Sequence, residues 1–232
     1  METNEFLEYV KKLNVEVTEE KLKKLEEYFQ ILILWNNKMN LTSITEKKDV
    51  YLKHFYDSLT ITKIVDLKQE ESLCDIGTGA GFPGIVLKIF FQHIKLTLVD
   101  SLNKRIVFLN EVIKELELDD VKTIHLRAED FAKTVREEFD VVTARAVSSF
   151  NTLLEYVIPL VKCDKYFVAM RGVDDTLESN KALNLLKAKK IQTLNFKLPI
   201  EESERTIVLV QKYDKTDLKY PRKFSDIKKK PL

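Results

Sequence analysis

Four of the five glycines in this 232-residue chain lie between Gly77 and Gly84. They follow a short β-rich run, residues 73–76, and open an apolar helical window. Because glycine tolerates positive φ and has no Cβ, such a cluster allows a ligand to approach the backbone closely. A tight turn without a ligand is the alternative. The spacing from Gly79 to Gly84 also satisfies G-x-G-x-x-G, so the glycines alone leave an NAD site open as well.

β-rich runs alternate with helical windows after residue 72, which predicts βαβ units in a doubly wound, mostly parallel sheet. The runs cover residues 73–76, 96–100, 121–126, 139–143 and 166–170. Two further runs, 191–198 and 206–211, are separated by a loop too short for a crossover helix, so we expect them to pair antiparallel. A terminal antiparallel hairpin is typical of Rossmann-like class I S-adenosylmethionine-dependent methyltransferases, whereas dehydrogenases usually continue with parallel strands.

Three regions follow from these patterns. Residues 1–65 form an N-terminal helical region, 66–213 the methyltransferase domain and 214–232 a basic C-terminal tail. Thr18 is the expected N-cap of a helix whose apolar stripe includes Leu25 and Leu32.

Charge and composition limit the function classes. The formal net charge is +1, which excludes binding to nucleic acid through bulk charge. Residues 219–232 nevertheless hold six basic residues and one acid, a cluster that can neutralise phosphates and order on binding RNA, or be a disordered terminus. No apolar run reaches about 18 residues, so we expect a cytoplasmic protein without a membrane segment. Two cysteines and three histidines make a metal centre unexpected.

Three polar residues lie at or just after the carboxyl ends of the later β-rich runs and are candidate ligand contacts. Asp100 ends the run 96–100, where a carboxylate accepts the ribose hydroxyls of an adenosine in both NAD and S-adenosylmethionine sites; the alternative is a helix N-cap. Glu129 borders the adenine or is an ordinary surface acid. Arg145 follows 139–143 at the carboxyl edge of the sheet, where a guanidinium donates to guanine O6 or to a phosphate. An ion pair with Asp140 or a neighbouring acid is the other interpretation.

Strings spread over nearly the whole chain carry a resemblance to a known family. They are residues 35–43, 54–58, 75–84, 100–101, 104–105, 108–109, 127–129, 145–146, 220–223 and 230–232. They resemble the RsmG (glucose-inhibited division protein B) family of 16S rRNA guanine-N7 methyltransferases. The resemblance implies S-adenosyl-L-methionine as cofactor and, as substrate, 16S rRNA within the small ribosomal subunit. The protein is then expected to act as a monomer.

The resemblance also assigns residues to the cofactor. Gly77 and Phe82 contact its methionine end and ribose side, and Asp100 holds the ribose. Ala128 and Glu129 border the adenine. The remaining expected cofactor-binding residues are Asp75, Gly79 and Arg145, which lies at the floor of the site. Arg127 and Arg171 match basic positions nearby, although the family usually has Lys at position 171.

The chemistry of methyl transfer favours guanine N7. Pyrimidine carbon-5 methylation needs a cysteine nucleophile, but Cys74 is expected to lie in the core of the sheet. Exocyclic amine methylation commonly uses an Asn/Asp-Pro-Pro-aromatic string, whereas residues 144–147 read Ala-Arg-Ala-Val. Guanine N7 has a free lone pair, so Arg145, Arg127 and Arg171 are interpreted as positioning rather than catalytic residues. An NAD-linked reductase and a non-enzymatic RNA-binding module are the competing functions.

Overall fold

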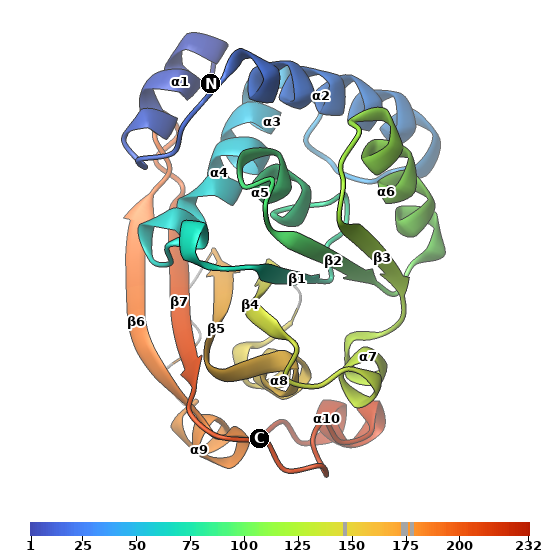
Figure 1. The fold of residues 1–232 in the computed structure, drawn as a ribbon, viewed down its shortest axis with the longest axis vertical. Coiled ribbons are helices and arrows are strands. Elements are labelled where there is room, and N and C mark those ends of the chain that lie inside the picture. The colour runs from blue at the N-terminus through green and yellow to red at the C-terminus, as the bar shows by residue number, and fades with distance from the viewer. Residues whose placement is uncertain (146–147, 173–175, 177–178) are drawn as a thin grey trace.

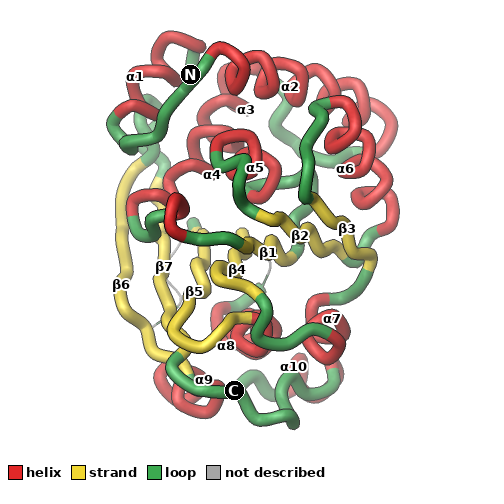
Figure 2. The backbone as a smooth tube through the Cα atoms, viewed as in Figure 1, coloured by secondary structure: helices red, strands yellow, loops and turns green. Residues whose placement is uncertain are grey.

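The computed structural model describes residues 1–145, 148–172, 176 and 179–232. Ala146 and Val147, which continue the string at Arg145, therefore lie outside the described residues. Within them, a seven-stranded sheet lies between two layers of helices (Figures 1 and 2). The strands are β1 Ser72–Ile76, β2 Lys95–Asp100, β3 Val121–His125, β4 Phe139–Arg145, β5 Val161–Arg171, β6 Ala188–Lys197 and β7 Glu204–Lys212.

The strand order is β3-β2-β1-β4-β5-β7-β6, and β7 runs antiparallel to both of its neighbours. The other pairs are parallel. This topology confirms the predicted fold class, including the terminal antiparallel hairpin. Both β4 and β5 extend to an arginine, so that Arg145 and Arg171 end neighbouring strands.

Helices cover both faces of the sheet (Figure 1). One layer holds α1 Thr3–Lys11, α2 Glu19–Met39, α3 Lys47–Val50, the π-helix Tyr51–Tyr56, α4 Asp57–Leu59, α5 Gly84–Phe90 and α6 Asn103–Glu115. The other holds α7 Ala128–Thr134, α8 Phe150–Val157, α9 Asn180–Leu186 and α10 Phe224–Lys229. In the described part of the chain, three short 3-10 turns complete the helical segments, at Thr60–Lys63, Leu67–Gln69 and Ile158–Leu160.

The N-terminal helices share one core with the sheet. Thr18 caps α2 as expected, since its Oγ1 accepts a hydrogen bond from the Lys21 amide at 3.3 Å. Fully buried Leu25 of α2 belongs to the same apolar cluster as Ile85 of α5 and Leu109 of α6. Burying one stripe of each helix in a common core fixes residues 41–58 against the carboxyl ends of the strands. The three-region division stays a prediction.

The basic tail packs against the second helical layer. Ile227 is fully buried, and the Arg222 guanidinium donates to both carboxylate oxygens of buried Glu155, at 2.8 and 2.7 Å. The carbonyl of Tyr220 accepts from Arg136 at 2.7 Å. Residues 219–232 are therefore ordered without RNA, which contradicts both ordering on binding and a disordered terminus, because the charge count does not reveal the apolar anchor and the ion pair with buried Glu155.

Candidate active site

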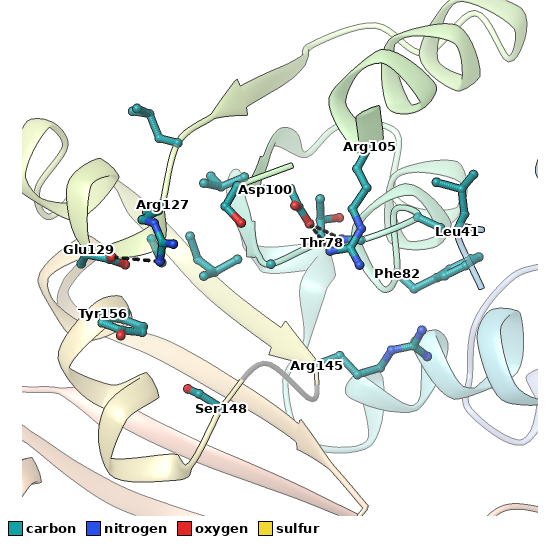
Figure 3. Close-up of a pocket in the computed structure, with 18 of the residues that line it drawn as sticks. Leu41, Thr78, Phe82, Asp100, Arg105, Arg127, Glu129, Arg145, Ser148 and Tyr156 are labelled. Carbon is teal, nitrogen blue, oxygen red and sulfur yellow. Dashed lines mark hydrogen bonds and ion pairs between the residues drawn. The ribbon is translucent and has the colours of Figure 1, made fainter. Parts of the chain in front are cut away.

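A cavity of about 530 Å³ lies at the carboxyl ends of β1, β2 and β4. Strand order reverses between β1 and β4, and ligands of open α/β sheets bind at such a switch point. We call it the first cavity. Figure 3 shows Arg127 and Glu129 at one end, Phe82 and Arg145 at the other, and Asp100 between them.

The glycine loop turns through positive φ at three positions, Gly77, Gly79 and Gly81. A Cβ at Gly81 would lie 2.6 Å from the Tyr28 hydroxyl, and one at Gly84 would lie 2.5 Å from a Leu98 methyl, so these two glycines are required by packing. A Cβ at Gly79 would meet only the Gly77 carbonyl, at 4.0 Å. The backbone at Gly79 is thus open to the first cavity, which fits close approach by a ligand.

Asp75 lies beneath this loop and does not line the first cavity. Its Oδ2 accepts hydrogen bonds from the Gly84 amide at 2.9 Å and the Thr78 hydroxyl at 2.7 Å. Its Oδ1 is buried and accepts none from the described residues. Complete burial raises the pKa of Asp75 to about 6. The structure therefore places this predicted cofactor ligand as a support of the loop.

Asp100 joins three elements at the cavity. Its Oδ2 accepts from the Gly79 amide and from Arg105 Nη1, both at 3.0 Å, and its Oδ1 accepts from the Leu102 amide at 2.9 Å. The helix N-cap considered as the alternative is not formed, because Leu102 is the N-cap residue of α6 and, among the described amides of the helix start, Asp100 binds only the amide of that residue. A carboxylate offers about four acceptor positions, so the described contacts leave capacity for a ligand hydroxyl.

Glu129 is buried, in contrast to the surface acid considered above, with 4% of its surface exposed. Its Oε1 accepts no hydrogen bond from the described residues, although Arg127 Nη1 lies 3.7 Å away. Tyr156 lines the same end of the cavity, and burial followed by the charge of Glu129 raises its pKa to about 12. A buried carboxylate oxygen without a hydrogen bond is costly and points to a donor on a ligand.

Arg145 is held by the N-terminal helical region. Its Nη1 donates to the Lys53 carbonyl at 3.0 Å and to Asp57 Oδ2 at 3.3 Å, and Nη2 faces His54 Nδ1 at 3.2 Å. Arg145 thus forms the ion pair that was the other interpretation, but with Asp57, whereas Asp140 pairs with Lys162. The partner is Asp57 because the packing of α4 brings it to the end of β4.

His54 is a cavity residue to which the sequence assigned no role in the site. Its ring stacks on Phe82, with centroids 4.3 Å apart, and its Nε2 lies 3.0 Å from the Thr42 hydroxyl. Burial, followed by the charge of Arg145, lowers the pKa of His54 to about 3. The ring is therefore neutral, with Nδ1 accepting from Arg145 and Nε2 donating to Thr42.

Several other predicted and unpredicted residues are now placed. Gly77, Gly79, Phe82, Asp100, Ala128, Glu129, Arg127 and Arg145 all line the first cavity, whereas Arg171 does not. Residues to which the sequence assigned no role at the cofactor also line it: Leu41, Thr42, Arg105, Tyr156 and Phe224. Thr42 lies in a string that carried the family resemblance, which was the available signal for it.

A family model described as rRNA small subunit methyltransferase G (GidB) matches residues 21–208. The chain belongs to this family. Relatives in the GidB family include the rRNA small subunit methyltransferase G of Exiguobacterium sp. AT1b, 47% identical over 100% of both chains. That of Staphylococcus aureus JH9 is 48% identical and covers 97% of this chain and 96% of its own.

Solved structures agree with the fold. An S-adenosylmethionine-dependent methyltransferase from Aquifex aeolicus superposes with a TM-score of 0.56 at 16% identity, covering 74% of this chain and 96% of its own. This GidB protein is an S-adenosyl-L-methionine-dependent methyltransferase of small-subunit rRNA, as the sequence predicted. Among the described residues, no helix is long and apolar enough to cross a membrane.

Proposed function

We propose that this GidB protein methylates N7 of a guanosine in 16S rRNA and that the first cavity holds the cofactor. The described residues suit S-adenosyl-L-methionine. Asp100 has acceptor positions for ribose hydroxyls, and Glu129 Oε1 is a buried acceptor at the end proposed for the adenine. No side chain covers the backbone at Gly79. When bound, S-adenosyl-L-methionine supplies an electrophilic methyl group.

The titratable groups of the first cavity favour a methyl acceptor whose attacking atom carries no proton. Of the possible general bases that contact Arg145, His54 accepts from that arginine through Nδ1 and its pKa is lowered to about 3, and Asp57 is paired with both Arg145 and Arg205. Tyr156 is neutral, because its pKa is raised to about 12. Guanine N7 carries a lone pair and no proton, so methylation there needs no base.

Rate enhancement then comes from orientation. Arg145 is fixed by two acceptors, the Lys53 carbonyl and Asp57, and its guanidinium lies over the Phe82 ring, 5.3 Å from the ring centroid. A group held this firmly presents its remaining donors and its charge without reorganisation. We assign Arg145 a positioning role at the reaction centre, with Arg127 and Arg171 as further positioning residues.

The finer setting belongs to the same proposal. The substrate is 16S rRNA in the context of the small ribosomal subunit, and the protein acts in the cytoplasm as a monomer. One observation supports the proposed activity most strongly. Asp100, Glu129 and the glycine loop line the same cavity in a chain of the GidB family.

The test uses 16S rRNA and 30S particles from a strain that lacks this gene. Purified protein and methyl-labelled cofactor are added, and 7-methylguanosine is located by borohydride reduction, aniline cleavage and primer extension. We expect label at one guanosine and cleavage at that nucleotide. Label without cleavage, or no label on either substrate, would contradict the proposal. Comparison of the two substrates identifies the form of rRNA that is used.

A further inference from the structure

Three acceptors from one short stretch of helix hold the guanidinium group of Arg145. Its Nη1 donates to the Lys53 carbonyl at 3.0 Å and to Asp57 Oδ2 at 3.3 Å, and its Nη2 lies 3.2 Å from His54 Nδ1. Lys53 and His54 belong to the π-helix Tyr51–Tyr56, and Asp57 follows directly after it. We call Lys53, His54 and Asp57 the guanidinium cradle.

The irregular winding of this helix explains why a backbone carbonyl is one of the three acceptors. In a regular α-helix the amide of Asp57 donates to the carbonyl of Lys53, four residues earlier. Here it donates to the carbonyls of Leu52 and His54, five and three residues back. The Lys53 carbonyl accepts from Arg145, 92 positions away. Single π-turns within helices are frequent at functional sites, and this one supplies a backbone acceptor to the end of β4.

Asp57 binds a second arginine as well. Its Oδ1 accepts from Arg205 Nε on β7 at 3.1 Å, while its Oδ2 accepts from Arg145 on β4. Only 4% of the Asp57 surface is exposed. A buried carboxylate between two guanidinium groups cannot rotate without losing a charge-assisted hydrogen bond. Asp57 therefore fixes the position of Arg145 more firmly than an exposed ion pair would.

His54 connects the cradle to the glycine loop. Its ring stacks on Phe82 with an angle of 14° between the ring planes, and its Nε2 lies 3.0 Å from the Thr42 hydroxyl. Phe82 and Arg145 both line the first cavity, and Figure 3 shows the Arg145 side chain extending from the end of β4 toward Phe82. The histidine thus makes two separate contacts. The face of its ring supports a wall of the proposed cofactor site, and its Nδ1 holds Arg145.

We propose that Asp57 and His54 are positioning residues for methyl transfer, which act by fixing the guanidinium of Arg145 rather than on the methyl acceptor itself. This inference rests on the proposed function, in which Arg145 lies at the reaction centre. A donor that is already fixed stabilises the reacting geometry without reorganisation, whereas a mobile one must be ordered during the reaction. Loss of a cradle contact to Arg145 should therefore slow the chemical step more than it weakens the binding of S-adenosyl-L-methionine or 16S rRNA.

The first arm of the test is a double-mutant cycle on the single-turnover rate, measured at saturating cofactor and rRNA. We expect Asp57→Asn and Arg145→Gln each to slow methyl transfer by about 10- to 100-fold, as a misplaced group does. Asp57→Asn should slow it no further in the Arg145→Gln background, because its effect passes through that arginine. Asp119→Asn, the same chemical change at an exposed position, should keep the wild-type rate.

The outcomes separate this inference from the proposed function. A wild-type protein that forms no 7-methylguanosine refutes the proposed function before any variant is compared. A slow Arg145→Gln together with a normal Asp57→Asn overturns the positioning role alone. Losses that multiply in the double variant also overturn it, since they show that Asp57 supports the fold independently of Arg145.

The second arm separates the two contacts of His54 and does not depend on the folding of Asp57→Asn. His54→Phe keeps a ring against Phe82 but loses the acceptor for Arg145, whereas His54→Asn keeps an acceptor near the place of Nδ1 but loses the ring. We expect His54→Phe to have the lower single-turnover rate, by about tenfold, and His54→Asn to have the higher Kd for S-adenosyl-L-methionine. Equal rates in the two variants, or a lower rate in His54→Asn, would overturn the inference.

Discussion

The guanidinium of Arg127 lies over the ring of Phe224, with its Cζ 4.7 Å from the ring centroid. Both residues line the first cavity, although 97 positions separate them in the chain. The C-terminal tail is therefore one wall of the proposed cofactor site, next to Glu129, which we propose borders the adenine. The cation–π contact also fixes the direction of an otherwise half-exposed arginine.

Phe224→Ala should weaken S-adenosyl-L-methionine binding by about 1 kcal/mol, because the cavity loses an aromatic wall and Arg127 loses its platform. Phe224→Trp should restore most of the affinity. Titration calorimetry measures both. Equal affinities in all three proteins would show that the tail is no part of the cofactor site.

Asp100→Asn should weaken cofactor binding by about 1–3 kcal/mol, since the amide keeps the shape but removes the charged acceptor. Asp130→Asn, an exposed carboxylate on α7, is the matched control and should bind normally. A folded Asp100→Asn protein with the affinity of the control would remove Asp100 from the ribose site.

Asp75 should make stability fall as the pH rises from about 4 to 6. Its pKa is raised from 3.8 in the ordinary carboxyl to about 6 in the fold, so in this window the unfolded chain has lost a proton that the folded chain keeps. One such group contributes up to about 1.4 kcal/mol per pH unit. Urea unfolding of Asp75→Asn should show this component removed. A difference from the wild type that is constant with pH would contradict the shift.

His54 should act in the opposite direction. Its pKa falls from 6.5 to about 3, so the neutral ring contributes stability above pH 6.5 that is lost as the pH falls toward 3. His54→Gln keeps a neutral hydrogen-bonding side chain and should lose less stability on acidification. If the unfolding free energies of His54→Gln and the wild type run parallel from pH 7 to 4, the buried ring is not neutral as inferred.

The sequence predicted the features of the fold that depend on the order of the elements along the chain. Alternating runs predicted the parallel strands, and a short connection predicted the antiparallel hairpin. Since parallel strands end at one edge, Asp100, Glu129 and Arg145 could be expected around one site before any contact was known.

Contacts between distant segments were not predictable in this way. Asp57 binds Arg145 and Arg205, which lie 88 and 148 positions away, and neither pair has a local pattern. The placement of Phe224 beside Arg127 depends on the burial of Ile227 and on the Arg222–Glu155 pair. The charge of residues 219–232 predicted a solvated terminus, because a count of charges does not show that Arg222 has a buried partner on another helix.

The central chemical claim is that the acceptor attacks through a lone pair that carries no proton. The pH profile of single-turnover methylation, measured by rapid quench at saturating cofactor and rRNA, tests it most directly. Arginines stay charged and His54 stays neutral over the working range, so the rate should be nearly flat from about pH 7 to 9. A tenfold rise per pH unit that one side-chain substitution abolishes would show that a base removes a proton, and guanine N7 would be the wrong acceptor.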